Sequence, residues 1–332
     1  MATHPVIPTF GRLLLGSWTP QARASVALAF AALFWSGNFI AGRALREDID
    51  PLTLNLLRWS FCLLIFLPWI GGKAWRHRVV VAREWRLLAL LGATGIAAFH
   101  TLVYQALAST TAINALLMLS LTPAAILTGA ALTRASRPSP AQWIGTLVSL
   151  LGAGFLLLRG APTVMHSLAF AAGDLWMFGA VAVWAAYSLL LSRRPADLPP
   201  DVALAASIVP AIVLLLGATL LHAGARPVLT PHMFWALVYI AVFASLIAFL
   251  LWSYGVDVIG PERAGQFVHL MPVFGAVLAL LFLGESMGLA QVVGAVFVFG
   301  GIGLVQAVRP HPSLPPLTQG RGCLCKRREW SK

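Results

Sequence analysis

Charged side chains are scarce in this chain, and acidic ones most of all. Only 11 of its 332 residues are Asp or Glu, and all charged residues together make up 10%, whereas an average soluble protein has about 25%. Hydrophobic residues make up 59%. This composition excludes the ordinary soluble enzyme and indicates an integral membrane protein.

The chain also has few cysteines, and none of them lies in a metal-binding pattern. Cys62 falls in an apolar stretch, where we expect it to pack as a small apolar residue. Cys323 and Cys325 form a lone C-x-C near the C-terminus without histidine partners. Three such cysteines make no disulfide framework, and we expect neither a metal nor a cofactor.

Enzyme motifs are missing, with one exception. The sequence holds no H-E-x-x-H and no glycine-rich phosphate loop followed by Lys-Ser/Thr. Gly284 to Gly288 match the G-x-S-x-G pattern of serine hydrolases, but they fall in a short turn between two apolar stretches instead of between a strand and a helix. We therefore expect no enzymatic activity, and an intramembrane hydrolase that uses Ser286 is a less favoured alternative.

The main feature of the sequence is a series of ten long apolar stretches. Helices of about 18 to 22 residues are about 27 to 33 Å long, which matches the hydrocarbon core of a bilayer. The sequence therefore predicts an all-α membrane protein with ten transmembrane helices. The predicted spans are residues 25–42, 54–70, 87–108, 111–132, 141–158, 174–192, 202–222, 234–256, 264–284 and 289–308.

The ten spans are two copies of one pattern. At an offset of 149 residues, one alignment without gaps pairs identical residues such as Trp35 with Trp184 and Pro123 with Pro272. Because five is an odd number of crossings, the second copy must enter the bilayer upside down, as in the inverted repeats of secondary transporters. The repeat also argues against cleavage of the first span as a signal peptide, because its partner is internal. The expected parts are a cytoplasmic segment 1–24, a first repeat 25–158, a second repeat 174–308 and a basic, proline-rich, disordered tail 309–332.

Lysine and arginine are distributed unevenly between the connections. If the N-terminus is cytoplasmic, 18 of the 23 basic residues lie inside, four lie outside and Arg58 lies within a span. The positive-inside rule therefore places both termini in the cytoplasm, and the short loops suit a bacterial inner membrane. It also accounts for the net charge of +12 without a nucleic-acid partner, since charges spread over short loops form no folded basic face.

Acidic residues are absent from the middle of every predicted span, so a buried carboxylate relay for protons is missing. His100 and His269 do lie inside spans, and either could exchange a proton near neutral pH. A neutral histidine that is hydrogen-bonded within the bundle is the simpler interpretation of each. Proton coupling therefore stays open.

Helical spacing and the repeat select candidates for a binding cavity. His100 shares a helix face with Tyr104, and Gln266 shares one with His269. Polar-aromatic pairs at equivalent places in the two copies suit an amphipathic solute, although packing between helices or interfacial anchoring would equally explain the tryptophans. The predicted cavity residues are Trp35, Asn38, Arg58, His100, Tyr104, Trp184, Tyr187, Gln266 and His269.

An arginine and a pair of prolines within the spans each have two interpretations, and two pairs of glycines have a structural one. Arg58 could snorkel to the outer interface or face the cavity and attract a carboxylate or phosphate. Pro123 and Pro272 each remove a backbone hydrogen bond, and they could serve as symmetric hinges or as simple bends. Gly145 with Gly152, and their mates Gly294 with Gly301, predict close packing of the fifth and tenth spans.

Several short motifs occur in order along the chain and are doubled at one offset. They include Phe34 to Phe39, Ala115 to Pro123, Trp184 to Tyr187 and Pro272 to Leu283. Together they resemble the EamA-type family of the drug/metabolite transporter superfamily. The first copy departs from the pattern at its fourth connection, where Arg134 to Pro138 stands opposite Leu283 to Met287. The resemblance implies ten helices around a central cavity, lined by both copies, and transport of small metabolites, often export of amino acids or related compounds.

The sequence as a whole thus predicts an exporter of amino acids or related small metabolites that works by alternating access. Its expected partners are the metabolite and the lipid bilayer, with a coupled proton left open, and its expected state is a monomer or homodimer. A non-transporting membrane scaffold or receptor of the same fold is the alternative.

Overall fold

The computed structural model describes residues 18–110, 112–158, 172–222, 230–283 and 288–307, and within these ranges the chain forms helices and no strands. The first copy comprises α2 (Pro20–Ala44), α3 (Pro51–Arg76), α4 (Arg78–Arg83), α5 (Trp85–Leu91), η1 (Gly92–Ala98), α6 (Phe99–Ser109), α7 (Ala112–Leu119), α8 (Thr122–Leu132) and α9 (Pro140–Leu157). The second comprises α11 (Ala172–Leu191), α12 (Pro200–Leu221), α13 (Pro231–Tyr239), η2 (Ile240–Ile247), α14 (Ala248–Ile259), α15 (Pro261–Gly265), η3 (Gln266–His269), α16 (Leu270–Leu283) and α17 (Leu289–Ala307). The prediction of an all-α fold is confirmed.

Nine helices in the described ranges are long and apolar enough to cross a membrane. They match nine of the ten predicted spans to within a few residues, except that the second continues to Arg76. The remaining predicted span is the ninth, 264–284, which corresponds to α15, η3 and α16. The 3-10 turn η3 interrupts this segment, so none of its helices is long enough by itself to cross a membrane. Large apolar side chains such as Leu64, Trp69 and Val213 face outward, as lipid-facing helices require.

Proline and a capping side chain begin several of these helices. Thr19, Asp50 and Ser139 each accept a hydrogen bond from a backbone N–H in the first turn of α2, α3 or α9, and a proline follows each. Proline is favoured there because its missing N–H would have no partner in the helix.

The long helix of each copy that follows α3 or α12 contains a π-helical turn. In the first copy this turn is η1, and in the second it is η2, at the equivalent place. A π turn leaves some backbone carbonyls for side chains to bind. The amide of Asn55 donates to the carbonyls of Ile96 and Ala97 in η1, and the carbonyl of Ala244 in η2 accepts from both Trp35 and Arg58.

Equivalent residues of the two copies touch along the centre of the bundle. The indoles of Trp35 and Trp184 meet edge to face with ring centroids 5.1 Å apart. The Nε2 atom of His269 lies 2.8 Å from the carbonyl oxygen of Ser120, its counterpart 149 positions earlier. Residues related by two-fold symmetry meet only near the symmetry axis. A pseudo-two-fold axis therefore passes beside these two pairs.

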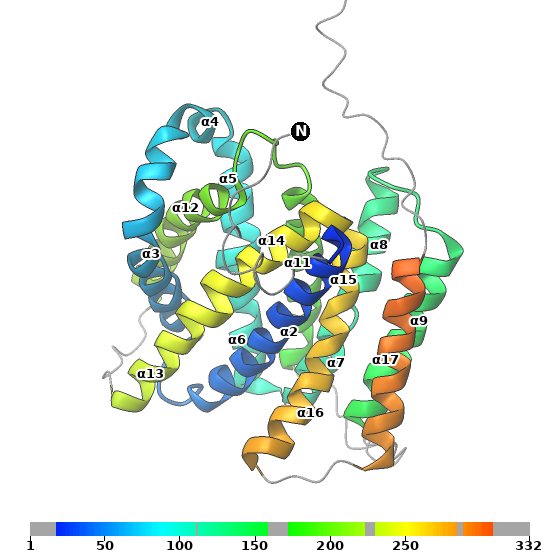
Figure 1. Cartoon of the computed structure of the whole chain (residues 1–332). Coiled ribbons are helices and arrows are strands. Elements are labelled where there is room, and N and C mark those ends of the chain that lie inside the picture. Colours follow the sequence, from blue (N-terminus) through cyan, green and yellow to red (C-terminus); the bar gives the residue numbers. More distant parts are fainter. Residues whose placement is uncertain (1–17, 111, 159–171, 223–229, 284–287, 308–332) are drawn as a thin grey trace, which may run out of the picture.

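Helices α9 and α17 pack closely together at one side of the bundle (Figure 1). A Cβ atom on Gly145 would collide with the backbone of Gly301, and one on Gly294 would collide with the backbone of Gly152. The hydroxyl of Ser149 on α9 also donates a hydrogen bond to the carbonyl of Val298 on α17. The predicted small-residue packing of the fifth and tenth spans is confirmed.

Ion pairs hold the two copies together at the end of the bundle that contains α4. Lys73 of α3 pairs with Asp201 of α12 at 2.6 Å, and Arg83 pairs with Asp197 at 2.9 Å. The hydrogen bonds that Arg83 donates to carboxylates raise its pKa. Arg194 and Asp257 form another pair at the same end, within the second copy.

The opposite end has a different kind of contact between the copies. The hydroxyl of Thr110 donates to Asp174 at the start of α11, over 2.7 Å. Arg43 donates to the carbonyls of Leu107 and Thr110, which holds the end of α6 against α2. This end is thus tied by hydrogen bonds to backbone and hydroxyl groups.

Both prolines proposed as hinges follow an interruption in their span. Pro123 lies in the first turn of α8, after the break between α7 and α8, and Pro272 lies in the first turn of α16, after η3. The interruptions occupy equivalent places in the two copies, as symmetric hinges would require. A hinge role stays a prediction.

Candidate functional site

A cluster of aromatic rings occupies the centre of the bundle, where the pseudo-axis passes. Trp35 of α2 and Trp184 of α11 both contact Phe249 and Trp252 of α14. The indole N–H of Trp35 donates to the carbonyl of Ala244 over 3.0 Å. Both predicted tryptophans are buried in protein, so they are not anchors at the membrane interface.

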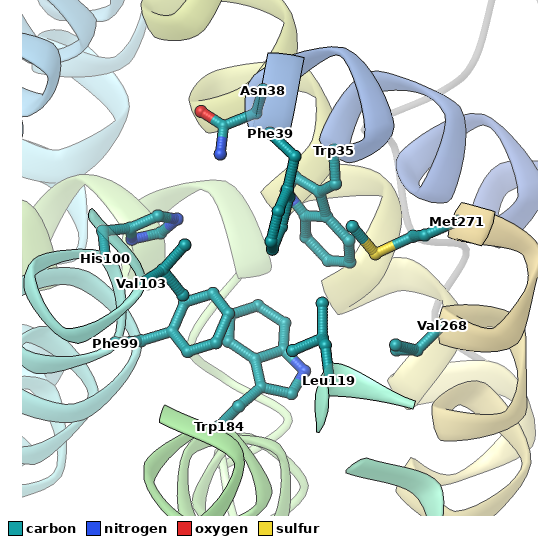
Figure 2. Close-up of a pocket in the computed structure, with 10 residues that line it drawn as sticks. All are labelled: Trp35, Asn38, Phe39, Phe99, His100, Val103, Leu119, Trp184, Val268 and Met271. Atoms are coloured by element: carbon teal, nitrogen blue, oxygen red, sulfur yellow. The ribbon is translucent and has the colours of Figure 1, made fainter. Parts of the chain in front are cut away.

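A small cavity lies against this cluster (Figure 2). Its volume is about 20 Å³, which is enough for one water molecule. Side chains from α2, α6, α7, α11, η3 and α16 form its wall, so both copies contribute. The lining residues are Trp35, Asn38, Phe39, Phe99, His100, Val103, Leu119, Trp184, Val268 and Met271.

Arg58 lies behind this wall, fully buried in α3. Its Nε atom donates to the hydroxyl of Ser245 at 2.5 Å, and Nη2 donates to the carbonyl of Ala244 at 2.9 Å. Its Nη1 atom donates to Asn38 Oδ1 at 3.2 Å and to the Tyr104 hydroxyl at 2.9 Å. The interpretation that Arg58 snorkels to the interface is therefore wrong, because its charged group is held deep between the two copies.

Asn38 connects Arg58 to the cavity. Its Oδ1 atom accepts hydrogen bonds from Arg58 and from Tyr104, the latter at 2.9 Å. Because one end of the amide is an acceptor and the other a donor, the NH₂ group is the end left for the cavity. Figure 2 shows this nitrogen directed into the space between His100 and Phe39.

His100 lines the cavity, whereas Tyr104, four residues later, does not. The His100 ring packs between Phe99, Trp59 and Phe249, with centroids 4.9 to 5.8 Å away. Its Nδ1 atom lies 3.4 Å from the carbonyl of Ile96. Tyr104 contributes indirectly, because its hydroxyl helps to fix the amide of Asn38.

Tyr187 also lies outside the cavity wall. Its ring packs on Trp184, with centroids 5.0 Å apart, and its hydroxyl is hydrogen-bonded with Ser253. A Cβ atom on Gly95 would overlap the ring, so the tyrosine lies directly against η1. It supports the aromatic wall from behind.

Gln266 and His269 form a separate polar group, next to the break between α7 and α8. The amide of Gln266 donates to the hydroxyl of Thr146 at 2.9 Å, and His269 contacts the carbonyl of Ser120. Residues three apart eclipse in a 3-10 turn, so these two share a face. Val268 of the same turn lines the cavity in their place. The buried Oε1 of Gln266 and Nδ1 of His269 have no hydrogen-bond partner among the described atoms.

The apolar part of the cavity wall was not predicted from the sequence. Phe39, Phe99, Leu119 and Met271 line the cavity, but nothing marks them among the many apolar residues of the spans. Trp35, Asn38, His100 and Trp184 are the predicted residues that the structure brings together around the cavity.

The described part of the chain contains no cluster of three or more His, Cys, Asp or Glu residues that could hold a metal ion. Cys62 is buried and free. Glu285, Ser286, Cys323, Cys325 and the tail 309–332 lie outside the described residues.

Comparison with known proteins identifies a family. The model of the EamA-like transporter family matches residues 22–158 and, a second time, residues 171–306. An "Uncharacterized transporter" of Archaeoglobus fulgidus is 24% identical over 86% of this chain and 98% of its own length. A "Probable terminal-alkyne amino-acid exporter" of Streptantibioticus cattleyicolor is 24% identical over 85% of this chain and 93% of its own.

A solved structure supports the same fold. It superposes with a TM-score of 0.70 at 22% identity, over 85% of this chain and 96% of the other. The double match of the family model confirms the two five-helix repeats, and the names of the relatives indicate a transporter. The chain is therefore a multi-pass integral membrane protein that belongs to the EamA-like transporter family.

Proposed function

We propose that this protein is a secondary transporter that exports amino acids or related small metabolites by alternating access. The observation that carries the proposal is the cavity on the pseudo-axis, to which side chains of both repeats contribute. Because each repeat supplies part of one wall, a movement of one repeat against the other would open and close the cavity.

The small size of the cavity fits a closed state of such a cycle. At about 20 Å³ it has room for a water molecule but not for a metabolite. A substrate would enter only after the repeats separate at one end. The ion pairs between copies at the α4 end, such as Lys73 with Asp201, and the Thr110–Asp174 hydrogen bond at the other end, are the contacts that would break in turn.

Other features of the proposal rest on the sequence and the relatives. The two matched ranges support repeats at 25–158 and 174–308. The distribution of basic residues supports cytoplasmic termini in a bacterial inner membrane, and a relative named as an amino-acid exporter supports the direction and the substrate class. We keep the monomer or homodimer, and proton coupling through His100 or His269, as open parts of the proposal.

The test compares small molecules in the medium and the cytosol of bacteria that express either the native chain or a Trp35→Ala, His100→Ala double variant at equal membrane abundance. A compound enriched in the medium only with the native chain supports export through this cavity. Export by both strains contradicts the site. A broad metabolite panel that shows no change with either chain contradicts transport.

The small cavity is also what a membrane scaffold or receptor of the same fold would have. A scaffold needs no open cavity, so it should tolerate His100→Ala and Tyr104→Phe without loss of its cellular effect. A transporter should lose transport in the first of these variants, since His100 lines the cavity.

A further inference from the structure

Among the residues that the structure describes, no carboxylate lies beside the cation at the centre of the molecule. Arg58 is fully buried, and its hydrogen-bond partners are two hydroxyls, one amide and one backbone carbonyl. The ionisable side chains that interact with it include Tyr104, Cys62, Tyr239 and His100. No carboxylate of the described residues is among them. A buried charge that has no counter-ion is costly even when it is hydrogen-bonded, so an anion that approaches this site would be stabilised.

The amide of Asn38 connects Arg58 to the cavity wall, because its oxygen accepts a hydrogen bond from the guanidinium group. Its oxygen is occupied by Arg58 and Tyr104, and its NH₂ group is directed into the cavity (Figure 2). Hydrogen bonds in series polarise one another, so the guanidinium strengthens the amide as a donor. The cavity therefore presents a donor with a positive charge behind it.

The rest of the wall contains no anion that could form an ion pair with a positive charge. Phe39, Phe99, Trp35 and Trp184 give it aromatic surfaces, and none of its lining residues is acidic. Acidic side chains lie instead at the ends of the helices, where Asp201 pairs with Lys73. An ammonium group in this cavity would lose its water without gaining a carboxylate.

The second repeat offers no equivalent cation. Ser207 occupies the place of Arg58, 149 positions later, and its buried hydroxyl has no hydrogen-bond partner among the described atoms. Tyr187 occupies the place of Asn38. The amide donor with a positive charge behind it thus lies on the side of the first repeat alone, so an asymmetric solute would bind in one orientation.

We infer that the substrate is a net-anionic, amphipathic acid, with a carboxylate recognised by Arg58 through Asn38, an aromatic or bulky apolar body, and no ammonium group. This inference rests on the proposed function and narrows its substrate class. Within amino acids and related compounds, it favours acids that have no free amine.

Three probes with one phenyl body test the head group directly: 3-phenylpropanoate, phenylalanine and phenethylamine. Their exchange is measured in liposomes that contain the purified full chain, after subtraction of leakage from protein-free liposomes. We expect 3-phenylpropanoate to exchange about tenfold faster than either other probe, the factor that one hydrogen bond with a charged group supplies. Equal or faster exchange of phenylalanine or phenethylamine overturns the inference.

Asn38→Asp separates recognition from structure. The variant has the same shape and places a carboxylate oxygen where Oδ1 already accepts from Arg58, so the fold should be at least as stable. Because the charge is then compensated within the protein, exchange of 3-phenylpropanoate should fall about tenfold. Native exchange by this variant would show that Arg58 has a structural role alone, and would overturn the inference.

Failure of the inference and failure of the proposed function can be told apart. If no probe is exchanged, or if the metabolite panel described above yields only substrates without a carboxylate, the inference is wrong while transport stands on that panel. If the panel also yields nothing, both are wrong. Ser207→Ala serves as the matched control and should leave exchange unchanged, because Ser207 stands at the place of Arg58 in the second repeat and its hydroxyl makes no hydrogen bond among the described atoms.

Discussion

The two repeats have the same arrangement of helices but differ in the side chains that they place around the cavity. Both contain a π turn at the same place and an interrupted helix at another. Yet Arg58 and His100 of the first repeat correspond to Ser207 and Phe249 of the second. The equivalent backbone therefore carries different side chains in the two repeats, and at this pair of positions only the first repeat has a positive charge.

The two ends of the bundle differ as well. Ion pairs between long side chains close the α4 end, whereas the other end is held by Thr110, Asp174 and Arg43 through hydrogen bonds. Charged pairs that are partly exposed are weak and are screened by salt. Such contacts suit a gate that must open in each cycle.

Substitution of the paired tryptophans should have the largest effect on stability. Trp184→Ala removes the ring that packs on Trp35 and Tyr187, at a cost of about 3–5 kcal/mol of unfolding free energy. Trp35→Ala should cost a similar amount, because the two positions are equivalent. Unfolding in detergent measures both. Trp176→Ala, on the lipid-facing side of the same helix, is the control and should change little; an equal loss there would contradict the central packing.

Glycine substitutions between α9 and α17 come next. A side chain on Gly301 would collide with the backbone of Gly145 and with Ser149, so Gly301→Leu should cost about 1–3 kcal/mol by overpacking. Gly152→Leu, the equivalent change in the first repeat, should match it. Gly300→Leu is the control, since a Cβ atom there meets nothing within 4 Å. Melting temperatures of the variants decide the matter, and similar values for Gly300 and Gly301 would refute the close contact.

A pair of substitutions at one place in the two repeats tests their chemical difference. Arg58→Gln should lower transport about tenfold, because it removes the charge behind Asn38. Ser207→Ala should leave transport unchanged, because the buried hydroxyl makes no hydrogen bond among the described atoms. Initial rates in liposomes measure both. Equal effects of the two changes would mean that the repeats do not differ in this way.

Removal of the ion pairs at the α4 end should have the smallest effect. Lys73→Met breaks a pair that is mostly shielded from solvent and should lower stability by about 1 kcal/mol or less. Arg83→Gln breaks an exposed pair, and its effect should vanish at high salt. We therefore expect Lys73→Met to lower the free energy of unfolding more than Arg83→Gln does. Unfolding measured at two salt concentrations tests this order, and a larger decrease for Arg83→Gln would contradict it.

Much of the scaffold was predictable from the sequence because lipid imposes simple rules. Long apolar runs gave nine of the helices, and the glycines at positions 145, 152, 294 and 301 gave the contact between α9 and α17. The π turns were not predictable, since η1 and η2 have no residue pattern in common that marks them. The 3-10 turn that breaks the ninth span was missed for the same reason.

The site was predictable only in part, because its contacts are made between distant segments. The guanidinium group of Arg58 is held in the interior by hydrogen bonds to Ser245 and Ala244, which are 187 and 186 positions away in the sequence. The residues next to Arg58 in the sequence therefore could not show whether it snorkels or is buried. Gln266 and His269 share a face as predicted, but the local turn directs Val268 to the cavity instead.

The most direct test of alternating access is a cross-link at the α4 end. Cysteines replace Lys73 and Asp201, whose side chains meet at 2.6 Å, in a chain from which the three native cysteines have been removed. A short bis-maleimide joins them, and transport of the compound found by the metabolite comparison is measured. Alternating access predicts that the cross-linked protein transports nothing while each single-cysteine control treated in the same way stays active. Native transport by the cross-linked protein would contradict it.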